Sequence, residues 1–579
     1  MPTEIFEFNH LKKNLKKDVS AFKTVKVALL SDAASQLITQ AIKGYGIEYG
    51  VKYDIFEADY NQIDRQVFDA GSELYEFAPD YVIILRSTEH LTKYFYKLDK
   101  SKKENFFTSQ IQYIDSLCQT INSKLKCKII IHNYIEINDS VFGNFASKVR
   151  SSLLYQVRKL NSGLMDFIQE RKNVFLLDLS SLVTKLGYNQ SFDTKSYFSA
   201  DMVFSIEFLP YLSKNIHNII QAVSGVFAKC IILDLDNTTW GGIIGDDGMD
   251  GIQIGDLGNG KIFSEFQLWV KQLKNRGIIV AVCSKNTEEI AKEPFISHPD
   301  MVLRLEDIAI FVANWENKAD NIRYIQKILN IGMDSIVFVD DNPFERELVK
   351  KEIPEIIVPT LPDDPAEYLC YLKELNLFET VSFTEGDEQR TLQYQEEAKR
   401  NSLLQSFANE EDFLANLEMV SEVKSFDGFT IPRVSQLSQR SNQFNVRTVR
   451  YTEEELKQIS NDKDYITFSF TLVDKFGDNG LIAFVVLKKT DDQTISIENW
   501  AMSCRVLKRG MELFTLTNIV EAASKQGYSK IIGEYIPTKK NMMVKDHYPS
   551  LGFMEAGDNR YELDIKNYKQ ARQTFITKK

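Results

Sequence analysis

The sequence predicts an α/β protein built from three successive domains, and two patterns lead to this fold class. Up to residue 378, short apolar runs alternate with longer amphipathic segments, which is the pattern of βαβ units around a parallel sheet. After residue 417, consecutive strands precede a helix, which is typical of an α+β domain. The length of 579 residues also exceeds what a single hydrophobic core supports.

The first domain is expected over residues 1–225. Its strands are predicted from apolar runs at 25–30, 51–56, 81–86, 128–135 and 173–179. The segments between these runs have the periodicity of amphipathic helices, so successive runs form βαβ units. They predict a parallel sheet with helices between its strands.

The second domain is expected over residues 226–378 and begins with the stretch CIILDLDNTTWGGIIGDDG at Cys230. A helix is predicted to end at Gly277, because glycine commonly stops a helix. Further strands are predicted at 278–286, at 334–346 and in the run that begins at residue 355. They continue the parallel α/β pattern.

The glycine-rich insertion at residues 241–260 follows the first strand of this domain. It is too short for a separate cap domain and favours a hairpin flap, with an ordinary surface hairpin as the alternative. Such a minimal cap would leave the neighbouring cleft open to a large partner.

A polar, helix-prone connector is expected over residues 379–416, followed by an α+β domain over 417–579. The stretch 465–489 predicts two strands joined by a turn at FGDNG. A strand at 494–506, a helix at 508–527 and a strand at 530–536 complete the pattern.

The composition is that of a globular protein with an acidic excess. Hydrophobic residues make up 44% and charged residues 26% of the chain, and the formal net charge is −12. A large nucleic-acid interface needs a basic field, so we expect no nucleic-acid partner.

The six cysteines form no CxxC pair, which disfavours zinc sites and disulfides and fits a reducing compartment. The N-terminal stretch lacks the apolar segment of a signal peptide, and no run of about 18 apolar residues occurs. We therefore expect a soluble, cytoplasmic protein without membrane contact.

Polar clusters follow three strands of the second domain, in the stretches DLDNT, CSKN and VDDN. The carboxyl ends of parallel strands lie on one edge of a sheet, where ligands gather. These stretches therefore predict one site, which a lysine that precedes a later helix could join. Its candidate residues are Asp234, Asp236, Thr238, Trp240, Ser284, Lys285, Asn286, Lys318, Asp340 and Asp341.

These residue types suit phosphoryl transfer. One carboxylate can attack phosphorus and form an aspartyl-phosphate, while another protonates the leaving group and later activates water. Mg²⁺ prefers carboxylates together with water and substrate oxygens. The alternative is that the aspartates only cap helices that follow the strands. Three clusters and a lysine in this order favour phosphoryl transfer.

The motifs DLDNT, CSKN, Lys318 and VDDN resemble the four motifs of the haloacid-dehalogenase (HAD) superfamily, whose core is Rossmann-like. The longer stretches LDLDNTTWGGIIGDDG and FVDDNPFER resemble the FkbH-like proteins of its subfamily IIIC, which carry out glyceryl transfer and dephosphorylation. The resemblance implies Asp234 as nucleophile, Asp236 as acid and base, and Lys318 as the charge-balancing cation. It implies phosphate or substrate binding by Thr238, Trp240, Ser284, Lys285 and Asn286. It also implies a Mg²⁺ site formed by Asp234, Asp236, Asp340 and Asp341.

The first domain resembles the SGNH-hydrolase-like, flavodoxin-type domain of multidomain FkbH-like proteins. Such hydrolases place a serine after the first strand, where this chain has Ala33, and a histidine three residues after an aspartate late in the domain. The late histidine here, His217, has no aspartate three residues before it. We therefore expect docking or scaffolding from this domain rather than hydrolysis.

The third domain resembles the acetyltransferase-like (GNAT) domain of the same proteins. Its stretch from Arg505 to Gly510 corresponds to a pyrophosphate-binding loop, with Lys508 in place of the first glycine. We expect Arg505, Lys508, Arg509 and Gly510 to bind a phosphopantetheine arm on an acyl carrier protein. Cys504 either holds the acyl group as a thioester or is a buried cysteine at a strand end. Cys283 is expected in the strand core.

The resemblance implies an enzyme that uses Mg²⁺ and a phosphorylated three-carbon donor such as 1,3-bisphosphoglycerate. It would remove phosphate at Asp234 and deliver a glyceryl unit to an acyl carrier protein thiol. The alternatives are a plain phosphatase acting on a small metabolite, and a non-catalytic multidomain scaffold.

Overall fold

The computed structural model describes residues 6–383, 390–404, 407, 409–503, 506–538, 540–568 and 574–579. Its contacts divide the chain into two compact units, one ending at Gln221 and one running from Ala222 to the C-terminus. Each unit is described separately below. Within the described ranges, no helix combines the length and apolar character that crossing a bilayer requires.

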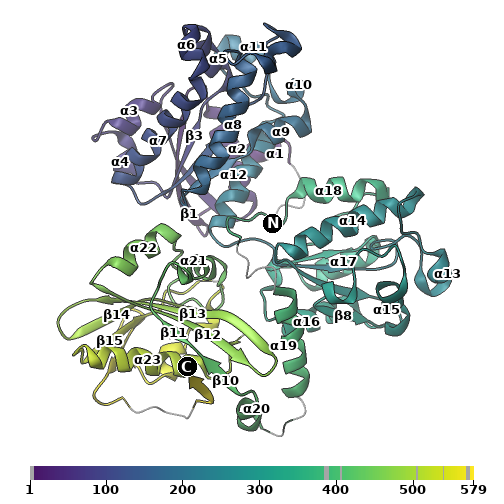
Figure 1. Cartoon of the computed structure of the whole chain (residues 1–579), viewed down its shortest axis with the longest axis vertical. Coiled ribbons are helices and arrows are strands. Elements are labelled where there is room, and N and C mark those ends of the chain that lie inside the picture. Colours follow the sequence, from purple (N-terminus) through teal and green to yellow (C-terminus); the bar gives the residue numbers. More distant parts are fainter. Residues whose placement is uncertain are drawn as a thin grey trace. The chain divides into compact units, whose positions relative to one another are not determined.

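The first unit is built on a five-stranded, fully parallel sheet (Figure 1). The strand order is β2-β1-β3-β4-β5, and the apolar runs of the sequence correctly predict all five strands. Both faces of the sheet are covered by helices, which explains why the run Val27–Leu30 is completely buried. The strands are β1 (Lys23–Ser31), β2 (Val51–Glu57), β3 (Tyr81–Leu85), β4 (Lys128–His132) and β5 (Val174–Leu177).

Helix α1 precedes the first strand, and the other helices of this unit connect successive strands or follow the last one. Their apolar sides pack on the sheet, as in α7 and α8, which share one buried cluster with β3 and β4. They are α1 (Phe8–Asn14), α2 (Gln36–Glu48), α3 (Ile63–Phe68), α4 (Glu73–Phe77), α5 (Thr88–Tyr96), α6 (Lys100–Glu104), α7 (Phe106–Lys124), α8 (Leu153–Gln169), α9 (Leu179–Leu186), α10 (Tyr188–Ser191), α11 (Thr194–Ala200) and α12 (Leu209–Val223).

The second unit begins with a four-stranded parallel sheet of order β8-β7-β6-β9. The sequence pattern predicts three of its strands and misses β8, a short run between two loops. The prediction of a strand after residue 355 is wrong, because Ile357 forms only an isolated bridge with Val337. The strands are β6 (Cys230–Leu233), β7 (Ile279–Ser284), β8 (Ile310–Ala313) and β9 (Ile336–Val339).

Two layers of helices sandwich this sheet. Helices α14 and α18 pack with one face, whereas α16, α17 and α19 pack with the other. The helices are α13 (Ile244–Gly251), α14 (Gly258–Asn275), α15 (Glu288–Ser297), α16 (Lys318–Leu329), α17 (Pro343–Glu352), α18 (Tyr368–Leu375) and α19 (Arg390–Leu404). The next helix, α20 (Glu410–Asn416), packs in the core of the C-terminal sheet instead.

The insertion after β6 corrects the expectation of a hairpin flap. It contains the short helix α13, and a bridge joins Gly241 before this helix to Gln253 after it. Asp246 and Asp247 lie in the first turn of α13, where carboxylates favour a helix. Gly248 has φ 66° and kinks this helix, so the glycine-rich stretch forms two short helical turns, the first of which the acidic residues stabilise.

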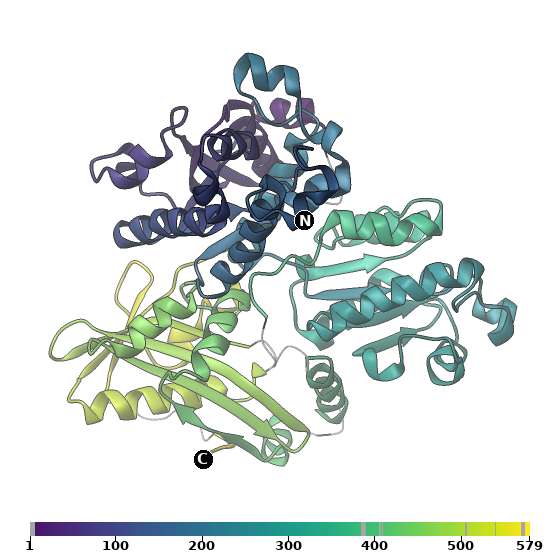
Figure 2. The ribbon, with the colours of Figure 1, turned by 45° about the horizontal axis from the view of Figure 1, so that its top comes forward.

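The C-terminal part of this unit contains a nine-stranded mixed sheet of order β16-β17-β15-β14-β13-β12-β10-β18, with β11 also paired to β12. Figure 2 shows its long antiparallel strands β12 and β13 side by side. The strands are β10 (Met419–Ser421), β11 (Val423–Lys424), β12 (Tyr465–Asp474), β13 (Gly477–Lys489), β14 (Thr494–Met502), β15 (Lys530–Glu534), β16 (Met554–Glu555), β17 (Arg560–Asp564) and β18 (Ile576–Lys578). The helices are α21 (Thr430–Arg440), α22 (Glu453–Asn461), α23 (Met511–Lys525) and α24 (His547–Ser550).

The turn between β12 and β13 differs from the predicted FGDNG. The strands are joined by Lys475 and Phe476, and Gly477 already belongs to β13. Asp474 accepts hydrogen bonds from the backbone N–H groups of Phe476 and Gly477, which fixes the tight turn at this earlier place.

Helix α19 contacts both sheets of the second unit. On one side, the Gln395 amide donates to the backbone oxygen of Ile308 at 2.8 Å. On the other, the Arg400 guanidinium pairs with Asp474 at 2.8 Å, and both side chains are almost completely buried. The connector helix is therefore an integral part of this unit.

His217 in α12 generates a prediction about pH. Its imidazole is buried, lies 2.8 Å from the Tyr53 hydroxyl, and has a pKa lowered to about 3 by burial. An unfolded histidine has a pKa of about 6.5. The stability that depends on neutral His217 is therefore fully present above pH 6.5 and is lost as pH falls toward 3. We expect His217→Gln, which cannot titrate, to lose about 2 kcal/mol less stability than the parent between pH 6.5 and 5.

Calorimetric unfolding of the full chain at several pH values measures this difference. His10→Gln is the matched control, because the His10 side chain is 44% exposed. Equal pH slopes for the parent and His217→Gln would contradict the prediction.

Candidate functional site

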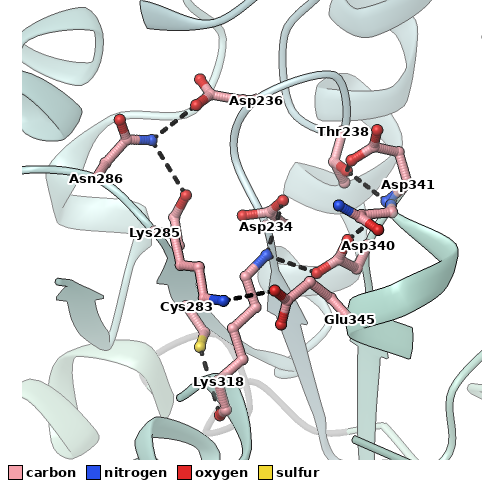
Figure 3. Close-up of polar contacts among 12 residues, drawn as sticks. Asp234, Asp236, Thr238, Cys283, Lys285, Asn286, Lys318, Asp340, Asp341 and Glu345 are labelled. Carbon is pink, nitrogen blue, oxygen red and sulfur yellow. Dashed lines mark hydrogen bonds and ion pairs between the residues drawn. The ribbon is translucent and has the colours of Figure 1, made fainter. Parts of the chain in front are cut away.

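The site lies at the carboxyl ends of β6, β7 and β9, where the parallel sheet brings the three polar stretches together (Figure 3). Leu233 and Val339 are register partners, so the next residues of both strands, Asp234 and Asp340, leave the sheet side by side. Lys318 arrives from the start of α16, which Asn317 caps through its side chain. The predicted convergence of these residues is observed.

The centre of the site is a buried ammonium between two buried carboxylates. The Lys318 Nζ lies 2.6 Å from Asp340 Oδ2 and 3.0 Å from Asp234 Oδ2. The three side chains are 4%, 0% and 9% exposed, respectively. Two neighbouring carboxylates in such a place require a cation, and Lys318 supplies one.

Burial and these charges shift the pKa values of the group. Burial raises the pKa of Asp234 to about 6, an effect that Lys318 opposes and Asp340 reinforces. Burial also raises the pKa of Asp340, against the effect of Lys318. Burial lowers the pKa of Lys318, but the two carboxylates outweigh it and leave that pKa raised. The lysine therefore stays charged at every physiological pH.

Three carboxylates of the site could hold a metal ion. Asp234, Asp340 and Asp341 each offer an oxygen, and these oxygens lie within 4.8 Å of one another. Asp234 Oδ1 is buried and has no hydrogen-bond partner. Leaving a buried carboxylate oxygen unpaired is costly, so this atom fits a position beside a bound cation.

Asp236 is not part of this carboxylate group, which corrects its expected place among the metal-binding side chains. Its carboxylate accepts hydrogen bonds from the Trp240 indole at 3.0 Å, the Ile244 backbone N–H at 3.0 Å and the Asn286 amide at 2.9 Å. Figure 3 shows it turned toward Asn286 and away from Lys318.

Trp240 also differs from its expected role in substrate binding. Its side chain is fully buried and its ring packs edge-on against Phe295, with 5.8 Å between the centroids. A side chain without exposed surface cannot contact a substrate in this conformation. Its indole N–H contacts Asp236 instead.

The remaining predicted residues line the same edge. The Thr238 hydroxyl donates to Asp341 Oδ1 at 3.2 Å and accepts from the Asp341 backbone N–H at 3.0 Å. The Ser284 hydroxyl accepts from the Asn286 amide at 3.3 Å. Lys285 is paired with Glu345 at 2.6 Å, with its own side chain 37% exposed. Cys283 is fully buried, as expected for strand core.

Several residues of the site are not among those predicted. Glu345 and Arg346 follow VDDN by only a few positions: Glu345 holds Lys285, and Arg346 donates to the backbone oxygens of Asp340 and Asp341. The Thr239 hydroxyl donates to the backbone oxygen of Asp234 at 2.6 Å. Their closeness in sequence to the aspartates was the available signal.

The first unit has its own polar residues at the end of β1. Ala33 is buried there. His217 lies away from this end, among Tyr45, Tyr49 and Tyr53, and Tyr53 pairs with Val25 near the start of β1. The histidine that faces Asp32 is His90, whose Nδ1 is 3.9 Å from that carboxylate. His90 also contacts Asp201 at 3.1 Å.

The predicted phosphopantetheine loop is described in part. Cys504 and Arg505 lie outside the described residues. Lys508 is exposed and has φ 63°, the backbone region that favours glycine, and Gly510 has φ 77° at the start of α23. Arg509 corrects the expectation of a ligand contact: it is buried and paired with Asp474 at 3.2 Å and with Glu397.

Comparison with known proteins gives relatives for the chain. Residues 26–221 match the family described as FkbH, N-terminal domain. No curated protein matches. The structure of the N-terminal part of the protein BF1531 from Bacteroides fragilis, containing a phosphatase domain complexed with Mg, is 49% identical, and the match covers 65% of this chain and 100% of that one with a TM-score of 0.63. The ribosomal-protein-S18-alanine N-acetyltransferase from Escherichia coli is 18% identical over 27% of this chain and 99% of that one, with a TM-score of 0.21.

The BF1531 match carries the assignment, because it combines high identity with complete coverage of the solved structure. The family match falls on the first unit, ahead of the carboxylate site. On this evidence, the chain belongs to the FkbH-like proteins of the HAD type.

Proposed function

We propose that the chain is a Mg²⁺-dependent HAD-type phosphotransferase that works through an aspartyl-phosphate at Asp234. The observation that carries the proposal is the buried group of Asp234, Lys318 and Asp340, in which Asp234 keeps one oxygen without a partner. That arrangement offers a carboxylate nucleophile beside a fixed cation.

In the first step an Asp234 oxygen attacks phosphorus. A bond from that oxygen to phosphorus forms, the bond to the leaving oxygen breaks, and Asp236 gives the leaving oxygen a proton. In the second step water attacks the aspartyl-phosphate, Asp236 takes the water proton, and Asp234 leaves as a carboxylate with release of phosphate. Lys318 balances the negative charge throughout.

Asp234, Asp340 and Asp341 are the residues that would hold Mg²⁺, and the BF1531 structure contains this ion. When bound, Mg²⁺ neutralises charge on the phosphoryl oxygens and orients them. Thr238 supports the site through Asp341. Ser284 and Lys285, at the end of β7, are proposed to contact phosphate once substrate enters.

We further propose that phosphate removal is coupled to transfer of a glyceryl unit to the thiol of an acyl carrier protein. This part of the proposal rests on the glyceryl transfer that the resemblance to FkbH-like proteins implies. With 1,3-bisphosphoglycerate, the ester phosphate would leave through Asp234. The carrier thiolate would attack the acyl carbon, forming a C–S bond and breaking the bond to the acyl phosphate. Exposed Lys508 and the start of α23 at Gly510 remain the proposed contacts for the phosphopantetheine phosphate.

A plain phosphatase acting on a small metabolite is the second candidate. It is favoured by Arg509, which is engaged in a buried ion network rather than available to a ligand. The carrier assay below separates the two functions.

The metal site generates a prediction for Asp340→Asn. Removing this carboxylate takes a negative charge from the group but keeps its shape, so we expect at least about tenfold weaker Mg²⁺ binding. Isothermal titration with Mg²⁺ measures the change. Asp363→Asn, which alters an exposed carboxylate of the same unit, should bind as tightly as the parent. Unchanged affinity of Asp340→Asn would remove this residue from the metal site.

The nucleophile generates a second prediction. Asp234→Asn cannot form the aspartyl-phosphate, so we expect turnover of 4-nitrophenyl phosphate with Mg²⁺ to fall at least about 1,000-fold. Asp363→Asn again serves as the control. Parental turnover by Asp234→Asn would show that the nucleophile is assigned wrongly.

Glyceryl transfer is tested with the parent protein, 1,3-bisphosphoglycerate, Mg²⁺ and a phosphopantetheine-bearing carrier protein. Intact mass spectrometry of the carrier should show the mass of one added glyceryl group. Rapid phosphate release without this adduct would favour the plain phosphatase, and absence of both reactions would favour the scaffold.

A further inference from the structure

Asp236 is held from three directions. Its Oδ1 accepts from the Trp240 indole N–H and from the Ile244 backbone N–H, each at 3.0 Å. Its Oδ2 accepts from the Asn286 amide at 2.9 Å. The donors come from the turn after β6, the first residue of α13 and the loop after β7, so the carboxyl group connects separate segments of the cleft.

The two side-chain donors are themselves fixed. Trp240 is fully buried against Phe295, and Asn286 is 4% exposed. Neither can turn away without breaking core packing or leaving a buried polar group unpaired. Their contacts therefore set the direction of the Asp236 carboxyl group rather than follow it.

The two carboxyl oxygens of Asp236 differ in the number of hydrogen bonds that they accept. A carbonyl oxygen accepts two hydrogen bonds through its two lone pairs, and Oδ1 already receives two. A hydroxyl oxygen can accept one bond and still carry a proton, and Oδ2 receives one. Oδ2 is therefore the oxygen with capacity left for a proton.

We propose that Trp240 and Asn286 are positioning residues that hold Asp236 so that Oδ2 transfers the proton. The proposal rests on the proposed phosphotransferase function and names the residues that support its acid and base. In the first step, the O–H bond at Oδ2 breaks as a bond between that proton and the leaving oxygen forms. The electron pair of the broken phosphorus–oxygen bond goes to the leaving oxygen, and Asp236 becomes a carboxylate held by three donors. In the second step, Oδ2 receives the proton of the attacking water.

Leaving-group dependence tests this role. A poor leaving group such as phenol, with a pKa of about 10, depends on protonation, whereas the more acidic 4-nitrophenol depends on it much less. The single-turnover release of both phenols from their phosphate esters is measured with Mg²⁺ for the parent, Trp240→Phe and Asn286→Leu. Both variants remove the N–H donor, and Asn286→Leu also keeps the approximate shape of the side chain.

We expect phenyl phosphate cleavage to fall at least about tenfold more than 4-nitrophenyl phosphate cleavage in both variants, since general acid catalysis contributes roughly 100-fold or more. Asp236→Asn gives the full size of this selective loss. Trp269→Phe is the matched control, because Trp269 packs near Phe378 on the same sheet face and should leave the ratio of the two rates unaltered.

An equal fall for both esters, or no fall, in the folded variants would overturn the proposal, because a purely structural role lowers both rates together. Circular dichroism and the melting temperature identify folded variants, and Asn286→Leu provides the test if Trp240→Phe does not fold. Asp234→Asn in the same assay distinguishes failure of the proposed function from failure of the positioning role. If this variant cleaves both esters normally, the phosphotransferase proposal fails. If it cleaves neither while Trp240→Phe lowers both rates equally, only the positioning role fails.

Discussion

The buried ammonium of Lys318 is the interaction on which the catalytic part of the second unit depends. Asp234 and Asp340 emerge from adjacent parallel strands, and without a cation their charges would repel inside the protein. Lys318 is the first residue of α16, so the helix that covers one sheet face also delivers the cation. Fold and charge balance are therefore set by the same element.

Around this centre, backbone oxygens at the strand ends are held by side chains from neighbouring turns. Thr239 binds the oxygen of Asp234, and Arg346 binds those of Asp340 and Asp341. These contacts restrict the directions in which the carboxylates point. The site is thus prepared before any ligand arrives, which is the condition for efficient electrostatic stabilisation of a transition state.

Much of the fold and the centre of the site follow from local sequence patterns. Apolar runs such as Cys230–Leu233 predict buried parallel strands, and the polar residues after them must share one edge of the sheet. The direction of a side chain does not follow in this way. Trp240 turns inward and Asp236 turns toward Asn286 because of partners distant in sequence. Arg509 is similar: nothing near it in the sequence predicts its pairing with Asp474, the last residue of β12.

Helix α19 has a practical consequence for dissecting the protein. On this helix, Arg400 forms an ion pair with Asp474 of β12, and Glu397 forms one with Arg509. The pairs Arg400–Glu397 and Arg509–Asp474 complete the network. A fragment that begins at residue 417 would lack the helix and leave Asp474 and Arg509 without two of their ionic neighbours. A fragment meant to hold the C-terminal sheet by itself must therefore begin before Arg390. Removing the helix to obtain a shorter phosphatase fragment would also uncover the apolar surface on which Tyr394 packs.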